Sequence, residues 1–299
     1  LPELLFNEYC VPEILMNLID PIKYTNILYE SLCTAIAWTG AQSRDTDVFN
    51  NDQFIYFLIE TSVYALSDQK FTGDKRIGNA SIGLLRNLVN NSEDIRILFI
   101  KMDGIKLFSS LYLEITDSKI KDYILWILQN CLNIGSEPPY DLLKDVEIVL
   151  RSSFTYLMNG VTQSEIRIAI AYVKCGPKFA ISLMENLDFE ISSVHFEYAL
   201  PDTQYSILDL FETLLFYPDD YVSNLASKKV KWGEVMLKIP KLMDKRLNKK
   251  FVSISYHYFS LIKEDPSCKY VNILNTPIIK ALIRIFESSK YSIKVKVID

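Results

Sequence analysis

The sequence predicts an all-α protein built from stacked helical repeats, and three observations lead to this prediction. Two stretches roughly 43 residues apart share one pattern, because the centre of Lys75–Leu111 recurs in shifted form at Tyr123–Gly135. The chain of 299 residues holds only 9 glycines, too few for the many turns of a β-sandwich or barrel. Apolar residues recur at helical spacing, and no segment alternates long enough to predict a strand. Repeats of this kind bury their apolar faces only against their neighbours.

Polar, glycine and proline breaks divide the first half of the chain into helices. Asn50-Asn51 precedes one helix and Ser92 precedes another. Such side chains cap a helix by accepting hydrogen bonds from its free first-turn N–H groups. Asp103-Gly104 turns the chain from a short helix into the next. The predicted helices are Glu3–Ile19, Tyr24–Thr39, Asp52–Leu66, Lys75–Val89, Ser92–Lys101, Ile105–Glu114 and Ser118–Leu132.

The second half continues in the same way, with breaks at Pro138-Pro139 and Gly176-Pro177. One stretch, Asp188–Thr203, lacks helical periodicity and mixes aromatic with acidic residues. It either folds over a binding surface or carries a contact site, or it is a diverged repeat whose first helix has lost its pattern. The predicted helices are Asp141–Asn159, Ser164–Lys174, Phe179–Asn186, Gln204–Phe216, Tyr221–Ala226, Trp232–Leu247, Phe251–Lys263 and Thr276–Ser288.

The repeat gives a register for the whole chain. Asn87 and Asn130 hold equivalent places near the ends of two apolar helices, and steps of about 42 to 43 residues extend the series. The step before Asn87 is longer, because the loop Ser67–Asp74 looks like an insertion. About six or seven repeats would fill residues 1–299 as a single domain. The later anchors of the series are Tyr172, Leu214 and Tyr256.

One segment resembles a known repeat family. Ala80–Leu111 begins with a small residue and contains LLRNL at Leu84–Leu88 and DGIKLF at Asp103–Phe108, and these features resemble an armadillo repeat. In that family a glycine lets one repeat turn sharply into the next, and Gly104 stands at this place. The resemblance is clearest over residues 24–135 and implies a right-handed α-solenoid of about six to seven armadillo-like repeats. The related HEAT repeats are the structural alternative.

The resemblance also implies a binding surface, because the third helices of successive armadillo repeats line a concave groove. In members that bind extended peptides, an asparagine on each third helix pairs with the peptide backbone, and a tryptophan one turn earlier packs on a lysine stem. Trp126 and Asn130 have this i, i+4 spacing, which is that of importin-α. Because the other repeats lack the pair, we do not expect the chain to bind basic nuclear-import signals in that manner. The equivalent pairs are Gly83–Asn87, Ile168–Tyr172 and Leu210–Leu214.

The predicted contact residues in this groove are Arg86, Asn87, Trp126 and Asn130, with Trp38 as a further one. Their replacement should weaken binding without unfolding the chain. The structural alternative is that the tryptophan packs between helices and that the asparagine caps a neighbouring segment.

A second candidate surface is basic. Lys228–Lys250 contains nine basic residues against Glu234 and Asp244. One interpretation of this density is a patch for an anionic partner; the interpretation that we favour is a pair of helices with solvated, lysine-rich outer faces. The formal net charge of the whole chain is −5, which argues against nucleic acid as a direct ligand. The residues of this predicted patch are Lys228, Lys229, Lys231, Lys245, Arg246, Lys249 and Lys250.

Catalytic and metal-binding patterns are absent from the sequence. The 2 histidines, His195 and His257, lie about 60 residues apart, and neither has a second ligand at metal spacing. There is no GxSxG, HExxH or phosphate-binding glycine loop. The 5 cysteines are scattered without CxxC spacing, which favours reduced thiols in a reducing compartment. We expect no enzymatic activity, no cofactor and no metal, and an intracellular protein of the cytoplasm or nucleus.

No apolar run reaches the ~18 residues that a membrane-spanning helix needs, so we expect no transmembrane segment. The chain begins at Leu1 rather than at methionine, which suggests a piece of a longer protein.

These observations lead to one functional prediction and one alternative. The prediction is a non-enzymatic scaffold that binds a peptide or helix of a partner protein in the concave groove. The alternative is an architectural or regulatory segment of a larger complex, which docks by its convex face, its ends or the basic patch.

Overall fold

The computed structural model describes residues 25–40, 49–67, 74–133, 140–155, 162–186, 193–229 and 244–264, together with position 283. Within these ranges the chain forms thirteen helices and no strand. The predicted all-α class is therefore confirmed. The chain divides into two compact units, Leu1–Ser152 and Ser153–Asp299.

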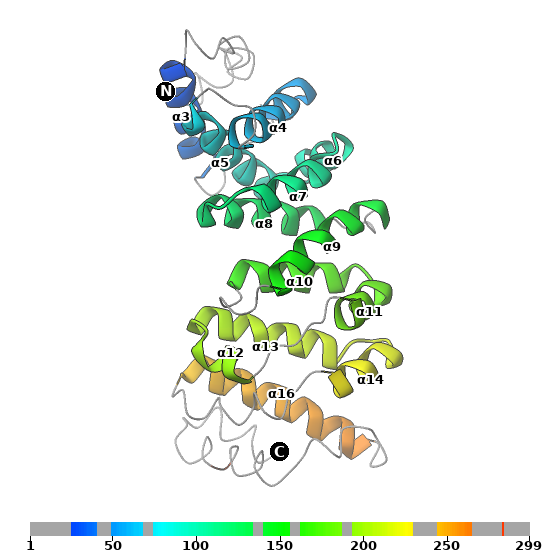
Figure 1. Cartoon of the computed structure of the whole chain (residues 1–299). Coiled ribbons are helices and arrows are strands. Elements are labelled where there is room, and N and C mark those ends of the chain that lie inside the picture. The colour runs from blue at the N-terminus through cyan, green and yellow to red at the C-terminus, as the bar shows by residue number, and fades with distance from the viewer. Residues whose placement is uncertain are drawn as a thin grey trace. The chain divides into compact units, whose positions relative to one another are not determined.

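The first unit is organised around a row of three helices. α3, α5 and α8 lie side by side, because α5 packs against both of the others (Figure 1). The shorter helices α6 and α7 pack against this row, and α4 packs against α5, α6 and α7. The helices of this unit are α3 (Thr25–Thr39), α4 (Asp52–Leu66), α5 (Lys75–Asn91), α6 (Glu93–Lys101), α7 (Gly104–Glu114), α8 (Ser118–Leu132) and α9 (Tyr140–Thr155), the last of which ends just beyond the unit.

Hydrogen bonds across the row show the direction and spacing of its helices. Near the start of α5, Arg76 Nη2 donates to Asn26 Oδ1, 50 residues earlier. At its end, Asn91 Nδ2 donates to the Thr39 carbonyl, 52 residues earlier. The two helices therefore run in the same direction, one repeat apart. This spacing confirms the longer step that the sequence predicts before Asn87.

Local side chains fix where these helices begin. Asn51 Oδ1 accepts the N–H of Phe54 at the start of α4, and Ser92 Oγ accepts that of Ile95 at the start of α6. Each bond satisfies one of the orphan donors of a first turn. The predicted helix Asp52–Leu66 is confirmed to the residue.

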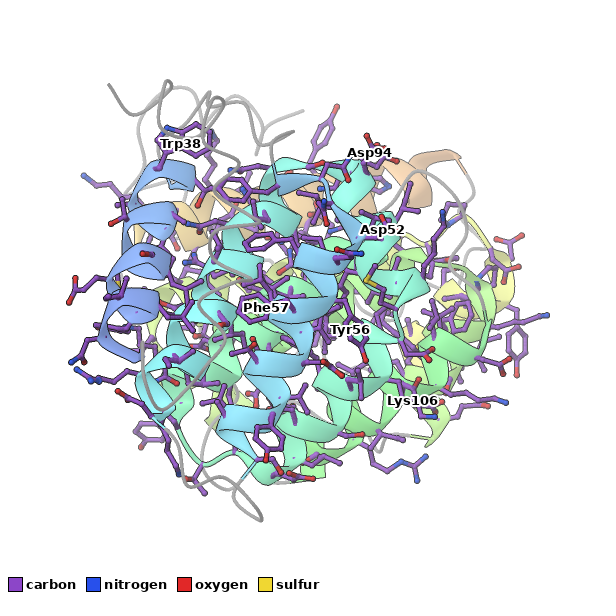
Figure 2. The ribbon with its side chains drawn as sticks, turned by 90° about the horizontal axis from the view of Figure 1, so that it is seen from above. Trp38, Asp52, Tyr56, Phe57, Asp94 and Lys106 are labelled. Carbon is purple, nitrogen blue, oxygen red and sulfur yellow. The ribbon has the colours of Figure 1, made fainter. Side chains whose placement is uncertain are left out.

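Aromatic side chains fill much of the core of the first unit. Phe54 is fully buried and lies between the rings of Phe49 and Phe57, with ring centroids 5.6 and 6.2 Å away. Figure 2 shows Phe57 among the helices of this unit, whereas Lys106 lies on the side away from α3. Phe99 and Phe108 meet edge to face at 5.1 Å. This burial, rather than helix propensity, provides most of the stability of such short helices.

Gly104 occupies the sharp turn between α6 and α7. A Cβ atom at this position would lie 2.6 Å from the Phe99 carbonyl oxygen and 2.7 Å from the Phe99 ring. The turn itself is made by Asp103, whose φ of 56° is the left-handed value. The glycine is therefore required by the close approach of the two helices, and the turn joins two short helices that pack beside α5 and α8.

The second unit repeats the same plan. α13 packs against α10 and α16, and α11 and α14 flank this row. Cross-row contacts have a spacing close to the predicted 42 to 43 residues, since Tyr217 Oη donates to the Val173 carbonyl and Arg246 pairs with Asp202, each 44 residues apart. The helices are α10 (Gln163–Lys174), α11 (Pro177–Asn186), α12 (Ser193–Tyr198), α13 (Pro201–Leu215), α14 (Asp220–Lys229) and α16 (Lys245–Glu264).

Two predictions about the second unit are wrong. The predicted break between Leu247 and Phe251 does not exist, because α16 runs through it with Leu247 and Phe251 buried on one face and the polar residues between them on the other. The stretch Asp188–Thr203 is not wholly irregular, since it contains α12 and the first turn of α13. The predicted helices Glu3–Ile19 and Thr276–Ser288 fall outside the described residues, except for position 283.

Candidate functional site

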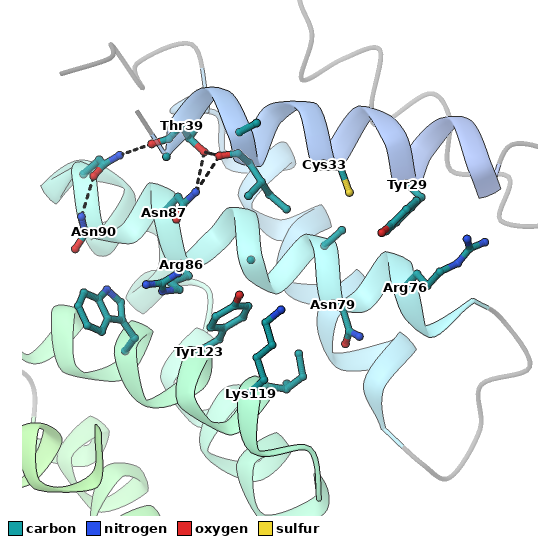
Figure 3. Close-up of a pocket in the computed structure, with 18 of the residues that line it drawn as sticks. Tyr29, Cys33, Thr39, Arg76, Asn79, Arg86, Asn87, Asn90, Lys119 and Tyr123 are labelled. Carbon is teal, nitrogen blue, oxygen red and sulfur yellow. Dashed lines mark hydrogen bonds between the residues drawn. The ribbon is translucent and has the colours of Figure 1, made fainter. Parts of the chain in front are cut away.

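An open hollow of about 900 Å³ lies along the row α3–α5–α8 (Figure 3). We call it the α5 groove, because α5 contributes its largest share of side chains. Its main lining residues are Tyr29, Cys33 and Thr39 of α3, Arg76, Asn79, Arg86, Asn87 and Asn90 of α5, and Lys119, Tyr123 and Trp126 of α8.

Gly83 is a buried residue of the groove lining. A Cβ atom there would lie 3.3 Å from Ile36 Cδ1 and 3.8 Å from Tyr123 Cε2. The absence of a side chain therefore lets α5 lie close to both α3 and α8. The tryptophan that a peptide-binding ladder would carry at this position would meet the side chains of Ile36 and Tyr123.

Asn87 lines the groove, but its amide is already engaged. Its Nδ2 donates to the Ile36 carbonyl at 3.1 Å and to Thr39 Oγ1 at 3.3 Å, and Asn91 Nδ2 donates to the Thr39 carbonyl at 3.0 Å. The Ile36 carbonyl also accepts the backbone N–H of Gly40, whereas the Thr39 carbonyl is one of the last carbonyls of α3, which have no partner within the helix. The two asparagines therefore cap the end of α3 from the next helix of the row, as the structural alternative predicts.

Arg86, the neighbour of Asn87, faces the other way, toward α8. Its guanidinium carbon lies 5.0 Å from the centroid of the Tyr123 ring and 5.1 Å from that of Trp126. Contacts at these distances are cation–π interactions. Arg86, Tyr123 and Trp126 are each half-buried, so the two rings restrict the guanidinium at the wall of the groove.

The other charged side chains that line the groove differ in the contacts that they make. Arg76 donates from Nε to both carboxylate oxygens of Asp74, the N-cap of α5, and these hydrogen bonds lower the pKa of Asp74. Lys119 Nζ lies 5.7 Å from the centroid of the Tyr123 ring. Asp117 is the one carboxylate among the described lining residues, and its Oδ1 accepts the backbone N–H of Lys119 as the N-cap of α8.

The other two predicted contact residues do not line the groove. Trp38 is 7% exposed and packs its ring on Phe49, 5.8 Å between centroids, near the end of α3 (Figure 2). Asn130 donates Nδ2 to the carbonyl of Trp126, one turn earlier in its own helix, at 2.9 Å. The groove thus brings together Arg86, Asn87 and Trp126, whereas Trp38 belongs to the core.

Part of the predicted basic patch lines a second hollow, of about 640 Å³, along α10, α13 and α16. Arg246 and Lys250 are held there by acidic side chains of the same unit: Arg246 Nη1 lies 3.0 Å from Asp202 Oδ1, and Lys250 contacts both Asp209 and Glu212. Lys245 and Lys249 are exposed. The side chains of Lys228, Lys229 and Lys231 lie outside the described residues.

The stretch that interrupts the repeats is anchored to α13. Phe196 of α12 is fully buried, and the buried Gln204 side chain donates to the Phe196 carbonyl at 2.8 Å. Tyr198 and Leu200 beside it are 84% and 75% exposed. The segment is thus fixed to α13 by Phe196 while it presents two apolar side chains to solvent.

The described residues contain no group of three His, Cys, Asp or Glu side chains that could hold a metal ion. His257 stacks on Phe216 at 3.9 Å between ring centroids, and the His195 side chain lies outside the described part. Cys33, Cys131 and Cys175 are free thiols, and burial raises the pKa of Cys131. Among the helices that the structure describes, none is long and apolar enough to cross a membrane.

Comparison with known proteins gives a likeness in fold. No protein-family model and no curated protein matches the sequence. The chain is similar to a designed armadillo repeat protein in complex with the peptide (KR)4, with a TM-score of 0.43 and 10% identity over 96% of each chain.

Two further solved structures are similar. Another designed armadillo repeat protein has a TM-score of 0.39 and 10% identity over 96% of each chain. An engineered protein studied as a structural-genomics target has a TM-score of 0.39 and 10% identity, over 96% of this chain and 93% of its own.

Proposed function

We propose that this chain is a non-enzymatic, intracellular interaction scaffold that binds an extended segment of a partner protein in the α5 groove. The observation that carries the proposal is the open hollow of about 900 Å³ along a row of helices, lined by amide, aromatic and cationic side chains. An extended segment laid across such a row meets one helix after another, which is how helical-repeat proteins recognise their partners.

The lining side chains suit a peptide. Asn79 and Asn90 are exposed on the groove face of α5, and each amide offers both a donor and an acceptor to a peptide backbone. The half-buried rings of Tyr29 and Tyr123 offer apolar surface for peptide side chains.

A peptide-display selection on the purified chain tests this proposal. Selected segments would be measured against the parent and against Asn79→Trp, which places a bulky ring in the groove at an exposed position. Gln53→Trp, at an exposed position in the first turn of α4, is the matched control. We expect binding to survive in Gln53→Trp and to be lost in Asn79→Trp. Equal binding to both variants would show that the groove is not the site.

A second candidate is docking by the outer helices within a larger complex. Tyr56 and Tyr64 of α4 are 49% and 61% exposed, and Leu113 of α7 is 48% exposed. None of these apolar side chains lines the groove. If selected segments bind Asn79→Trp normally but fail to bind a variant with Tyr64→Ser and Leu113→Ser, the outer surface is the docking site.

A further inference from the structure

The α5 groove has an excess of positive charge. Its lining includes three cationic side chains, Arg76, Arg86 and Lys119, against the single carboxylate of Asp117 in the described part. That carboxylate is occupied as the N-cap of α8. Arg76 is likewise already paired with Asp74 in a salt bridge. The cations that remain for a ligand are Arg86 and Lys119.

The side chain of Arg86 is positioned to bind a planar anion such as a carboxylate. Its guanidinium carbon lies over the rings of Tyr123 and Trp126, and within the described ranges neither a carboxylate nor any other acceptor is bonded to it. The edge of a guanidinium carries N–H donors in a fork that matches the two oxygens of a carboxylate. Because the rings already restrict the side chain, binding would cost little further rotamer entropy.

The neighbouring side chains extend this site along α5. Asn79 lies about two helical turns before Arg86 and Asn90 about one turn after it, so all three project on the same face. Lys119 lies beside Tyr123 on α8. A segment that places a carboxylate at Arg86 would therefore meet amides on both sides along α5 and a second cation on α8.

We propose that the α5 groove is selective for an extended acidic segment of a partner protein, with one Asp or Glu carboxylate bound by the edge of Arg86 and another near Lys119. This inference rests on the proposed function, that the groove binds a peptide. An acidic peptide is favoured over nucleic acid, because Arg86 and Lys119 can pair with one or two carboxylates, whereas a phosphate backbone is bound by many cations and the net charge of the whole chain is −5.

Three fluorescein-labelled peptides of equal length test the charge preference: alternating Glu–Ser, alternating Gln–Ser and alternating Lys–Ser. Their affinities for the full chain would be measured by fluorescence anisotropy. We expect the Glu–Ser peptide to bind at least about tenfold more tightly than either of the others, since a hydrogen-bonded charge pair contributes this much. A phosphoserine version of the Gln–Ser peptide shows whether phosphate replaces carboxylate.

Variants separate the role of Arg86 from general charge. Arg86→Ala should weaken binding of the Glu–Ser peptide by about 10- to 100-fold. Arg86→Lys keeps the charge without the fork, so its loss should be intermediate. Lys106→Ala removes a positive charge at an exposed position of α7 away from α3 (Figure 2) and should change the affinity less than about twofold. Circular dichroism would confirm that each variant is folded.

The outcomes distinguish this inference from the proposed function. If the Gln–Ser or Lys–Ser peptide binds at least as tightly as Glu–Ser, and Asn79→Trp abolishes that binding, the groove binds peptides but the acidic preference is wrong. If Arg86→Ala is folded and binds Glu–Ser with unchanged affinity, the assignment of Arg86 is overturned. If none of the peptides binds the parent, the acidic preference is refuted, and the segments from the peptide-display selection decide separately whether the groove is a peptide site.

Discussion

Replacing Asn87 by aspartate tests whether an amide on α5 holds the end of α3. The substitution keeps the size of the side chain but replaces the donor that lies 3.1 Å from the Ile36 carbonyl and 3.3 Å from Thr39 Oγ1. Loss of these two hydrogen bonds should cost about 1–2 kcal/mol. A carboxylate at the negative end of the α3 dipole should cost a further ~0.3–1 kcal/mol. We therefore expect the free energy of unfolding to fall by about 2 kcal/mol.

Urea and thermal unfolding followed by circular dichroism would measure this effect. A loss of about 2 kcal/mol corresponds to roughly 4–8 °C in Tm for a unit of this size. Asn79→Asp is the matched control, because it adds the same charge to an exposed position of the same helix, with no hydrogen bond in the described part of the chain. Its effect should stay within ~0.5 kcal/mol.

Two results would refute the reasoning about Asn87. Unfolding of Asn87→Asp at the same urea concentration as the parent would mean that the end of α3 does not depend on the amide. An equal loss in Asn79→Asp would mean that negative charge on this face of α5, rather than the missing cap, destabilises the unit.

Three further predictions concern other parts of the fold. Gly104→Ala should destabilise the chain by about 1–3 kcal/mol in urea unfolding, because its Cβ would lie 2.6 Å from the Phe99 carbonyl; an unchanged midpoint would contradict this. In the native protein, iodoacetamide should alkylate Cys33, which lines the groove, and spare Cys131, whose burial raises its pKa, as read by peptide mass spectrometry. Equal labelling of the two would show that α8 opens. Burial lowers the pKa of Lys250, but its hydrogen bonds to two carboxylates of α13 outweigh this and raise it above the ordinary 10.5. The folded-state pKa is thus above the unfolded one, so the stability that Lys250 contributes is complete below pH 10.5 and is lost as pH rises through the raised pKa. Lys250→Met should abolish this loss in urea titrations; an unchanged alkaline loss would exclude Lys250 as its source.

The repeat was predictable from the sequence because burial acts on every helix in the same way. A helix that packs on its neighbours shows its apolar face at helical spacing, and the anchors Tyr172, Leu214 and Tyr256 do fall on α10, α13 and α16, the packed row of the second unit. The break predicted between Leu247 and Phe251 was wrong for a physical reason. A polar run within an amphipathic helix has the same composition as a loop, and only its packing separates the two.

The site was less predictable, because an exposed polar side chain has several partners within reach. Asn87 was expected to meet a ligand, yet its donor caps α3. Tyr123 and Lys119 were not predicted at all. The register contained a usable signal for Tyr123: it stands two turns before Asn130, and Trp126 stands one turn before it. Side chains on a helix lean toward its N-terminus. Tyr123 and Trp126 were therefore positioned to meet Arg86, which stands beside Asn87, the preceding anchor.

The difference between Asn87 and Arg86 explains how a row of helices can bind a partner without a complete asparagine ladder. The two residues are adjacent on α5, about 100° apart around its axis, so one faces α3 and the other faces α8. A ligand backbone that takes the Asn87 donor must break the bonds of Asn87 to the Ile36 carbonyl and to Thr39 Oγ1, and the cost of these lost bonds offsets the gain from the new bond. A ligand carboxylate that binds the guanidinium of Arg86 displaces no described hydrogen bond, because the described contacts of this group are with the rings of Tyr123 and Trp126. Recognition through the cation is therefore favoured over recognition through the amide, and it leaves the row intact.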